Sequence, residues 1–553
     1  MYFNKIKYFL FLLFTFITCK ISIIDAQYFN GPNKPDYKTF DYKVYTSPHF
    51  EIYHYSDNDS LIHTFAINAE KWYQNHLKIF KDTFKVKNPI ILYNNHADFQ
   101  QTNAIMETIG VGTGGVTESL KNRVVLPIME SAGQTDHVLG HELVHAFQYH
   151  LLLSDDSGMM RSTRNIPLWM IEGMAEYLSI GSVDSHTSMW MRDALINNDF
   201  PTLEDMTRSY KYFPYRYGQA FWAFVTGLYG DSIIRPLFDL TTKMGYDKAL
   251  DSLTHLNEKS FSNFWKVKMK EQYYSLLKDT VEKPVGDKLL YRKNAGAMNI
   301  APSFSPDGNY IIFLSEKDLF TFDLYKYNLK KKKIRKVSST VRNNKIDDFN
   351  YLESGGSWSP DGKKFCFVSF SKGRNRLLII DVKKPRKTYE IDIPGVEAFS
   401  NPAWSPDGKK IIVTGLKNGI TDIYMYNLED KSVENITNDV YCNLMSSWST
   451  DGKFIVYSTD EDQNDSSNTK YSKGYNICIF NLETKKKNII KVFNGCDNLN
   501  PQFSKDNKSI YFVSDANGVR NLYEYSIDSS KVFRLTNLIT GLCGITKFTP
   551  AIS

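Results

Sequence analysis

The chain has 553 residues, more than a single hydrophobic core usually holds, so we expect at least two domains. A hydrophobic share of 42% and an aromatic share of 14% are enough to fill packed cores and exclude a largely disordered chain. The 67 basic and 61 acidic residues leave a net charge of +6. This near balance gives no concentrated basic face, so no nucleic-acid partner is expected.

The first 26 residues have the features of a secretory signal peptide. Two lysines precede an apolar run from Tyr8 to Thr18, and Ala26 precedes a suitable cleavage point. The run is shorter than the roughly 20 apolar residues that a spanning helix needs. An uncleaved anchor, a core helix and a lipid on Cys19 are the alternatives. We predict a signal at 1–26 and an exported chain, in the periplasm, at the cell surface or secreted, with no membrane span after signal removal.

Residues 27–283 alternate strand-like and helical text, which predicts an α+β domain. Segments 49–55 and 88–95 are rich in β-branched and aromatic residues, as strands are. Segments 59–80, 135–153 and 167–180 carry apolar residues at helical spacing. Thr135 or Asp136 can cap the second of these helices.

The helix predicted over 135–153 contains the sequence HELVH, with His141, Glu142 and His145. Residues four apart lie on one face of a helix, so both imidazoles can reach one metal ion. Zinc accepts nitrogen and oxygen ligands, and the neighbouring carboxylate of Glu142 can act as general base on a water molecule.

The helix predicted over 167–180 supplies two further carboxylates. Glu172 follows His145 by 27 residues and can be the third, anionic ligand. Glu176 lies one turn later on the same face and can accept a hydrogen bond from a ligating imidazole.

With both helices, the sequence resembles the glutamate zincins (gluzincins), specifically the peptidase MA-like group, whose pattern is a HEXXH helix followed by a W-x-x-E-G-x-A-E-Y helix. The resemblance covers about residues 90–240. It implies a zincin-like metallopeptidase domain at 27–283 that binds Zn2+. The implied roles are metal ligand for His141, His145 and Glu172, general base for Glu142, and support of a ligating imidazole for Glu176.

The resemblance suggests further site residues with less specific signals. Tyr217 stands where related enzymes carry a tyrosine that steadies the tetrahedral intermediate, and Tyr215 competes for this role. Segment 122–129 resembles the strand that pairs with an extended substrate, although an ordinary sheet strand is equally compatible. The glycine-rich segment 110–115 is interpreted as a turn above the catalytic cleft, because no βαβ pattern surrounds it.

After residue 283 the sequence becomes a repeat of strand text with Pro-Asp-Gly-like turns. Its anchor aromatics recur at intervals of 44–55 residues: Phe304, Trp358, Trp404, Trp448 and Phe503. Four strands per repeat at this period predict propeller blades. The repeats resemble the TolB-type branch of WD40-like propellers and imply an all-β, six-bladed ring over 284–553. A sixth anchor, Phe548, is followed by only five residues, so we expect this last blade to be incomplete, through truncation in the sixth blade or ring closure by strands near residue 290.

The favoured function is that of an exported zinc metallopeptidase that acts on peptide or protein substrates, with endopeptidase action slightly favoured over exopeptidase action. The propeller would bind a protein partner on one of its faces. The alternative is a non-catalytic TolB-like protein for protein–protein interaction or envelope assembly. A zinc hydrolase acting on a non-peptide bond is a third reading.

Overall fold

The computed structural model describes residues 35–553 except 120, 154–164, 280–285, 319–320 and 462–473. The predicted signal at 1–26 lies outside the described residues, as does the predicted domain boundary at 283/284, and both stay predictions. None of the helices in the described part of the chain is both long and apolar enough to cross a membrane.

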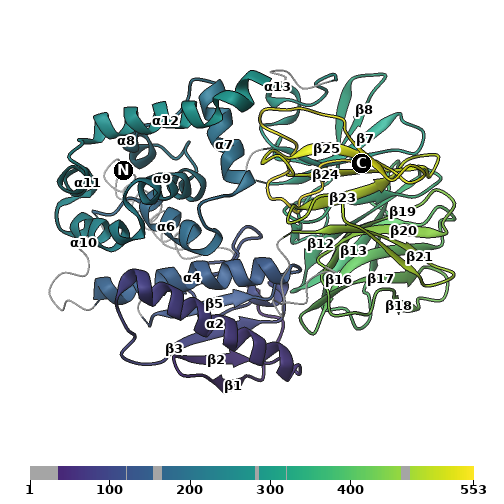
Figure 1. Cartoon of the computed structure of the whole chain (residues 1–553). Helices are drawn as coiled ribbons and strands as arrows, with labels where there is room; N and C mark the ends of the chain where they lie inside the picture. The colour runs from purple at the N-terminus through teal and green to yellow at the C-terminus, as the bar shows by residue number, and fades with distance from the viewer. Residues whose placement is uncertain (1–34, 120, 154–164, 280–285, 319–320, 462–473) are drawn as a thin grey trace, which may run out of the picture.

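The structure has an N-terminal α/β region beside a C-terminal β-propeller (Figure 1). The α/β region contains a mixed five-stranded sheet with the order β1-β2-β3-β5-β4. β2 and β3 pair in parallel, as do β3 and β5, whereas the two outer pairs are antiparallel. The strand bounds are β1 Lys43–Thr46, β2 Phe50–His54, β3 Asn88–Tyr93, β4 Val116–Glu118 and β5 Arg123–Pro127.

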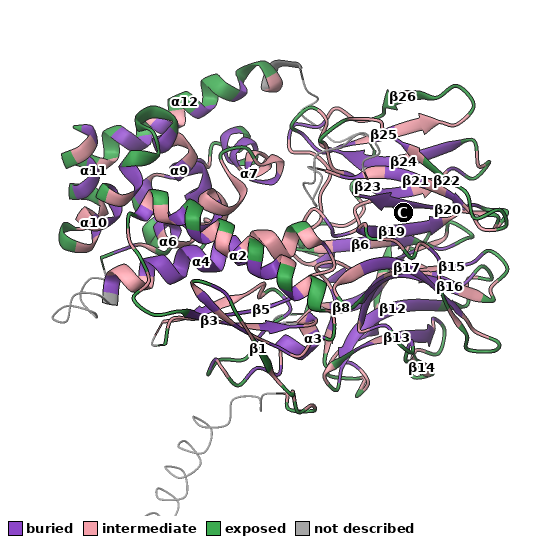
Figure 2. Cartoon of the chain, turned by 60° about the horizontal axis from the view of Figure 1, so that its bottom comes forward, coloured by how far each residue is buried: buried purple, intermediate pink, exposed green. Residues whose placement is uncertain are grey.

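Two long helices, α2 (Asp59–Phe80) and α4 (Ala132–Leu153), pack together beside this sheet. α4 is mostly buried, whereas much of α12 (Glu258–Asp279) is exposed (Figure 2). His76 of α2 donates to the Gly140 carbonyl of α4 at 2.9 Å, and a Cβ on Gly140 would lie 2.8 Å from the Trp72 ring. This close approach fixes the position of α4 along α2.

α4 begins earlier than the sequence predicts. Ser131, rather than Thr135 or Asp136, is the residue whose hydroxyl accepts from a first-turn amide, that of Gln134, at 3.3 Å. The hydroxyl of Thr135 instead accepts from the Met129 amide.

Helices α6 to α12 pack around the same apolar core. α6 and α9 make the closest helix pair among them, and the candidate site lies where α6 meets α4. The bounds are α3 His96–Phe99, α6 Leu168–Ile180, α7 Ser185–Ile196, α8 Leu203–Arg208, α9 Pro214–Tyr229, α10 Ile234–Met244, α11 Tyr246–Thr254 and α13 Arg292–Ala295, with a 3-10 turn η1 at Asp231–Ile233.

The propeller contains five antiparallel blades in the described residues, not the six that the repeats predict. The blades are β6 (Asn299–Phe304), β7 (Tyr310–Ser315), β8 (Asp323–Asn328) and β9 (Lys333–Ser338); β10 (Asp348–Phe349), β11 (Gly356–Trp358), β12 (Lys364–Ser371), β13 (Arg374–Asp381) and β14 (Thr388–Ile391); β15 (Ala398–Trp404), β16 (Lys410–Lys417), β17 (Ile420–Asn427) and β18 (Val433–Asn435); β19 (Asn443–Trp448), β20 (Phe454–Thr459), β21 (Asn476–Asn481) and β22 (Lys487–Ile490); and β23 (Asn498–Phe503), β24 (Ser509–Ser514), β25 (Asn521–Ser526) and β26 (Lys531–Arg534).

The segment after β26 explains the difference. No strand is assigned after β26 among the described residues, so the segment around Phe548 builds no sixth blade. Phe548 instead packs against Tyr475, and the amide of Ile552 donates to the side chain of Asn500 at 3.0 Å. The end of the chain therefore contacts the inner strands of other blades.

The repeated residues of the blades have repeated physical roles. In each blade a serine hydroxyl donates to the aspartate two residues later at 2.6 Å, as Ser359 does to Asp361. Two of the three tryptophan anchors join neighbouring blades, because Trp358 donates to the Ser303 carbonyl and Trp448 to the Ala403 carbonyl, each at 3.0 Å. The third, Trp404, donates to the Gly408 carbonyl of its own blade at 3.0 Å. The sequence interpretation of the Pro-Asp-Gly-like turns as connections between consecutive strands is confirmed, because each joins two paired antiparallel strands.

We expect Trp448→Phe to lower the free energy of unfolding by about 1–2 kcal/mol, because the Ala403 carbonyl loses its inter-blade hydrogen bond. Chemical denaturation, monitored by tryptophan fluorescence, measures this change. Phe304 and Phe503 show that a phenyl ring fits the anchor position, so an unchanged unfolding curve would mean that the indole bond contributes nothing.

Candidate metal centre

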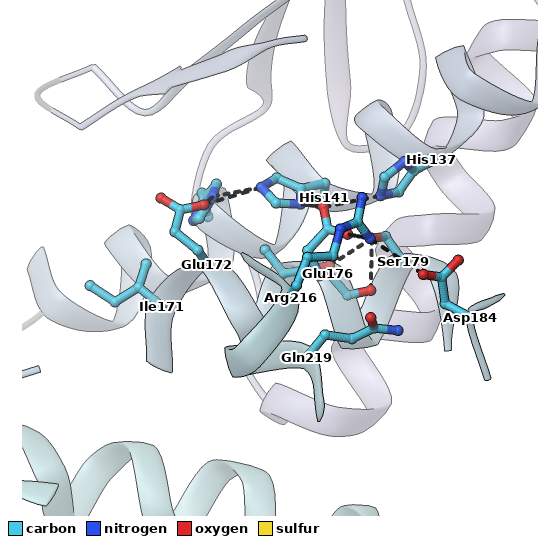
Figure 3. Close-up of polar contacts among 12 residues, drawn as sticks. His137, His141, Ile171, Glu172, Glu176, Ser179, Asp184, Arg216 and Gln219 are labelled. Atoms are coloured by element: carbon cyan, nitrogen blue, oxygen red, sulfur yellow. Dashed lines mark hydrogen bonds and ion pairs between the residues drawn. The ribbon is translucent and has the colours of Figure 1, made fainter. Parts of the chain in front are cut away.

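Three electron-pair donors from α4 and α6 converge on one point. The Nε2 atoms of His141 and His145 lie 3.1 Å apart. The Oε2 atom of Glu172 lies 3.4 Å from the first and 3.3 Å from the second. His141 and His145 are buried, and the Glu172 side chain is exposed to 15%. Figure 3 shows Glu172 and His141 directed toward one another.

This triangle has the dimensions of three ligands around a zinc ion. Tetrahedral ligands at bond lengths of about 2.0–2.1 Å are separated by roughly 3.3–3.4 Å, close to the three distances observed. Glu172 Oε2 is buried and has no hydrogen-bond donor among the described residues. The residues present therefore fit a small tetrahedral cation.

Hydrogen bonds on the far side of each imidazole direct its lone pair into the triangle. His145 Nδ1 lies 2.9 Å from Gln148 Oε1, and the amide nitrogen of Gln148 donates to the Ile171 carbonyl at 3.2 Å. The oxygen of Gln148 consequently faces His145, so Nδ1 carries the hydrogen and Nε2 the lone pair. His141 Nδ1 lies 3.2 Å from Glu176 Oε1, which gives His141 the same tautomer.

Gln148 was missed by the sequence interpretation. It stands three residues after His145, on the same face of α4, in an otherwise apolar and aromatic stretch. A polar residue at this spacing was the available signal. Because it also bonds the residue before Glu172, Gln148 connects two candidate ligands on different helices.

Glu176 joins the site to α7 and α9. Its carboxylate lies 3.3 Å from His137 Nε2 and 3.3 Å from Arg216 Nη1. Arg216 also contacts Asp184, which caps α7, at 3.5 Å (Figure 3). Although burial opposes it, the pKa of Glu176 is held well below its usual range by His137 and His141. Glu176 is therefore a charged acceptor.

The same carboxylates make the cluster attractive to positive charge. Burial lowers the pKa of His141, but its contacts with Glu172 and Glu176 outweigh burial and raise that pKa to about 10. Burial raises the pKa of Glu172, yet the contacts with His141 and His145 bring it below the ordinary value. A proton or a metal ion is needed to balance this arrangement.

Glu142 lies on α4 beside the ligand cluster and is held by the edge strand β4. The hydroxyl of Thr117 lies 2.8 Å from both Glu142 Oε2 and the Glu142 carbonyl oxygen, which share its one hydrogen. A Cβ on Gly115 would lie 3.0 Å from Glu142 Oε1, so glycine at this position leaves space beside that oxygen. The glycine-rich segment 110–115 thus lies against the candidate base.

The structure brings Tyr215, rather than Tyr217, to the cluster. The Tyr215 ring stacks on His141 with 5.7 Å between centroids and 14° between planes. Tyr217 lies two residues further along α9 and is buried against Trp190 and Tyr212. Residues two apart point to nearly opposite sides of a helix, so only one of the two can face the histidines.

Two further features, segment 122–129 and His150, have structural positions outside the cluster. β5, within the predicted substrate-pairing segment 122–129, is paired with β3 on one side and β4 on the other, so the edge strand beside the site is β4. His150 lies 2.6 Å from Asp82 and belongs to neither metal-ligand cluster found among the described residues.

Comparisons with known proteins match the two parts of the chain separately. Residues 90–252 match the family model described as peptidase of plants and bacteria, and residues 350–466 match the TolB β-propeller domain. The Tol-Pal system protein TolB of Ruthia magnifica subsp. Calyptogena magnifica is 34% identical over 83 residues, which are 15% of this chain and 19% of that relative.

Solved structures are similar at lower identity. TolB from Acinetobacter baumannii is 19% identical, with 55% of this chain and 70% of that chain covered and a TM-score of 0.37. An oligogalacturonate lyase from Vibrio parahaemolyticus is 14% identical, with 45% and 68% covered and a TM-score of 0.33. The chain thus contains a TolB-type β-propeller domain and a region similar to a peptidase family.

We expect Gly173→Ala to destabilise the α/β region strongly. Gly173 follows Glu172 in α6, and a Cβ there would overlap the main chain of Gly218 in α9. Relieving that overlap must separate the two helices, at a cost of about 3 kcal/mol or more. Thermal unfolding of the purified variant is the measurement.

Gly227→Ala is the matched control, because Gly227 lies in the same helix α9 and a Cβ there meets nothing within 4 Å. This variant should be neutral or stabilised by up to about 1 kcal/mol. Equal effects of the two substitutions would contradict the close helix crossing.

Proposed function

We propose that the chain is an exported zinc metallopeptidase in which His141, His145 and Glu172 hold the ion and Glu142 is the general base. The observation that carries this proposal is the convergence of two Nε2 atoms and one Oε2 atom within 3.4 Å of one another. The carboxylate of Glu142 lies beside these three atoms and is held by Thr117. The match of residues 90–252 to a peptidase family supports it.

When bound, zinc supplies Lewis acidity toward a peptide carbonyl and toward water. Glu142 moves the proton. Thr117 lies against Oε2, whereas Oε1 lies beside the space left by Gly115, so we assign to Oε1 the proton taken from the attacking water and passed to the leaving amine. Glu176 and Gln148 keep both imidazoles in the required tautomer.

Tyr215 is placed to donate a hydrogen bond to the substrate oxygen as it becomes negative. Burial, Glu172 and Glu142 all raise the pKa of its hydroxyl, which therefore keeps its proton at neutral pH. A preorganised donor of this kind stabilises the transition state more than the ground state. Tyr217, enclosed by aromatic rings, has no such position.

A second candidate function is non-catalytic binding of a protein by the TolB-type propeller, favoured by the propeller match and its 34% identity to a TolB protein over 83 residues. One face of the propeller already contacts the α/β region, where Ser400 donates to Glu130 at 2.5 Å. We therefore place a protein partner on another face. In the peptidase proposal, that partner is recruited as substrate or regulator.

We expect Glu142→Gln to reduce peptide cleavage by about 10²–10⁴-fold while zinc stays near one ion per chain, because the amide cannot take the proton. Turnover on a random peptide library and zinc by mass spectrometry measure the two quantities.

Glu172→Gln is the comparison variant and should lose zinc as well as activity, because an anionic ligand becomes neutral. If the parent chain binds zinc but cleaves no peptide, the peptidase proposal is wrong and the propeller carries the function.

We expect Tyr215→Phe to lower kcat by about 10²–10³-fold with little change in KM, because one transition-state donor is removed. Tyr217→Phe is the matched control and should keep the parent kcat. A loss confined to Tyr217→Phe would reverse the assignment of the tyrosine.

A further inference from the structure

A cavity of about 170 Å³ lies between the α/β region and the propeller, and neither His141 nor His145 lines it. The α/β region contributes the glycine-rich turn at Gly112 and Gly114 and the loop that leads into α4, with Glu130. The propeller contributes Glu353 and the side chains of Asn350 and Asn375. The cavity is therefore walled by both parts of the chain.

Two carboxylates line this cavity without a cationic partner. Glu130 Oε2 accepts from Ser400 at 2.5 Å, and Glu353 Oε1 accepts from the amide of Gln134 at 3.1 Å. The second oxygen of each carboxylate has no hydrogen-bond donor among the described residues. No lysine or arginine lines the cavity, and burial lowers the pKa of its one histidine, His96, to about 4. Burial raises the pKa of both carboxyl groups, and no cationic side chain in the cavity wall would stabilise them in the ionised form.

The same wall holds one buried amide oxygen without a hydrogen bond and a second amide side chain. Asn375 is exposed to only 4%, and its Oδ1 has no hydrogen bond, although its Nδ2 donates to the Phe399 carbonyl at 3.2 Å. Asn350 is exposed to only 6%, and its side chain makes no hydrogen bond with the described residues. Leaving the buried Oδ1 atom of Asn375 unpaired costs free energy that a ligand in the cavity would recover.

We propose that this cavity binds a hard divalent cation of the calcium class, with Glu130 and Glu353 as its anionic ligands and the Asn350 and Asn375 carboxamides as neutral oxygen ligands. Calcium takes six to eight oxygen ligands, and carboxylates, Asn carbonyls and water are the usual set. The cavity is large enough for the ion and several waters, since a water molecule occupies about 30 Å³.

The bound cation would join the two parts of the chain. Glu130 lies two residues before α4, and Glu353 lies in the propeller between β10 and β11. Burial and the repulsion from Glu353 together raise the pKa of Glu130 well above its usual value. An ion bound between the two carboxylates would attract both of them and remove this repulsion. It would thus hold the propeller against the N-terminus of the helix that carries His141.

Calorimetric titration of the zinc-loaded full chain with CaCl2, together with thermal unfolding, tests the proposal. We expect one calcium ion per chain and a rise of several degrees in the unfolding temperature at saturating calcium. Glu130→Gln and Glu353→Gln should each weaken calcium binding by roughly tenfold or more and reduce the thermal shift. Zinc content should stay unchanged in both, so the outcome is independent of the peptidase proposal.

Glu397→Gln is the matched control. Glu397 is a largely buried propeller carboxylate with a raised pKa, caused by burial, that does not line the cavity. This variant should bind calcium as the parent does. Absence of calcium binding in the parent, or equal binding by the parent and Glu353→Gln, would overturn the proposal. A third outcome would also overturn the proposal: Glu353→Gln is more stable than the parent without calcium, and the parent does not respond to calcium. Glu130 and Glu353 would then share a proton in place of an ion.

Discussion

Two imidazole nitrogens and a carboxylate oxygen lie within 3.4 Å of one another with their lone pairs facing inward, and this arrangement is unfavourable unless a positive charge lies between them. Most of the α/β region can be understood as the support for that arrangement. Gln148 and Glu176 accept from the Nδ1 atoms and so keep the N–H groups of both imidazoles pointing away from the cluster. An N–H group turned inward would relieve the repulsion between the lone pairs, but it would also occupy the candidate metal position. Thr117 keeps Glu142 beside the cluster but outside it.

The cluster can form only if α4 and α6 are held at fixed positions. α6 is held by its crossing with α9, where Gly173 and Gly218 let the two backbones meet, and this crossing also brings Tyr215 over His141. α4 is held by α2 through His76 and, at its first residues, by the propeller, since Ser131 bonds the Tyr475 hydroxyl at 2.7 Å. The propeller is therefore a structural neighbour of the helix that carries His141 and His145, in addition to any partner that it binds.

Much of this could be predicted from the sequence, because helical spacing alone places His141 and His145 on one face and the repeat alone predicts four-stranded blades. The number of blades could not, because an anchor aromatic such as Phe548 marks a repeat without showing whether its segment pairs as a strand or packs on other blades, as Phe548 does on Tyr475. The choice between Tyr215 and Tyr217 depends on the rotation of α9 against α6. That rotation is set by the Gly173–Gly218 contact and has no local sequence signal.

The interface between the two parts was also beyond the sequence. Glu130 and Glu353 are 223 residues apart and look like ordinary surface carboxylates in their local contexts. Only the packing of the propeller against the start of α4 encloses them in one cavity. Long-range contacts of this kind depend on how two folded units dock, which hydrophobic periodicity does not encode.

X-ray absorption at the zinc edge, recorded on the purified full chain, tests the account of the metal centre most directly. The account predicts two imidazole nitrogens and at least one carboxylate oxygen at about 2.0–2.2 Å from the ion. A sulfur shell near 2.3 Å, which would place the ion on cysteine, or a chain that retains no zinc after purification without chelators, would contradict it.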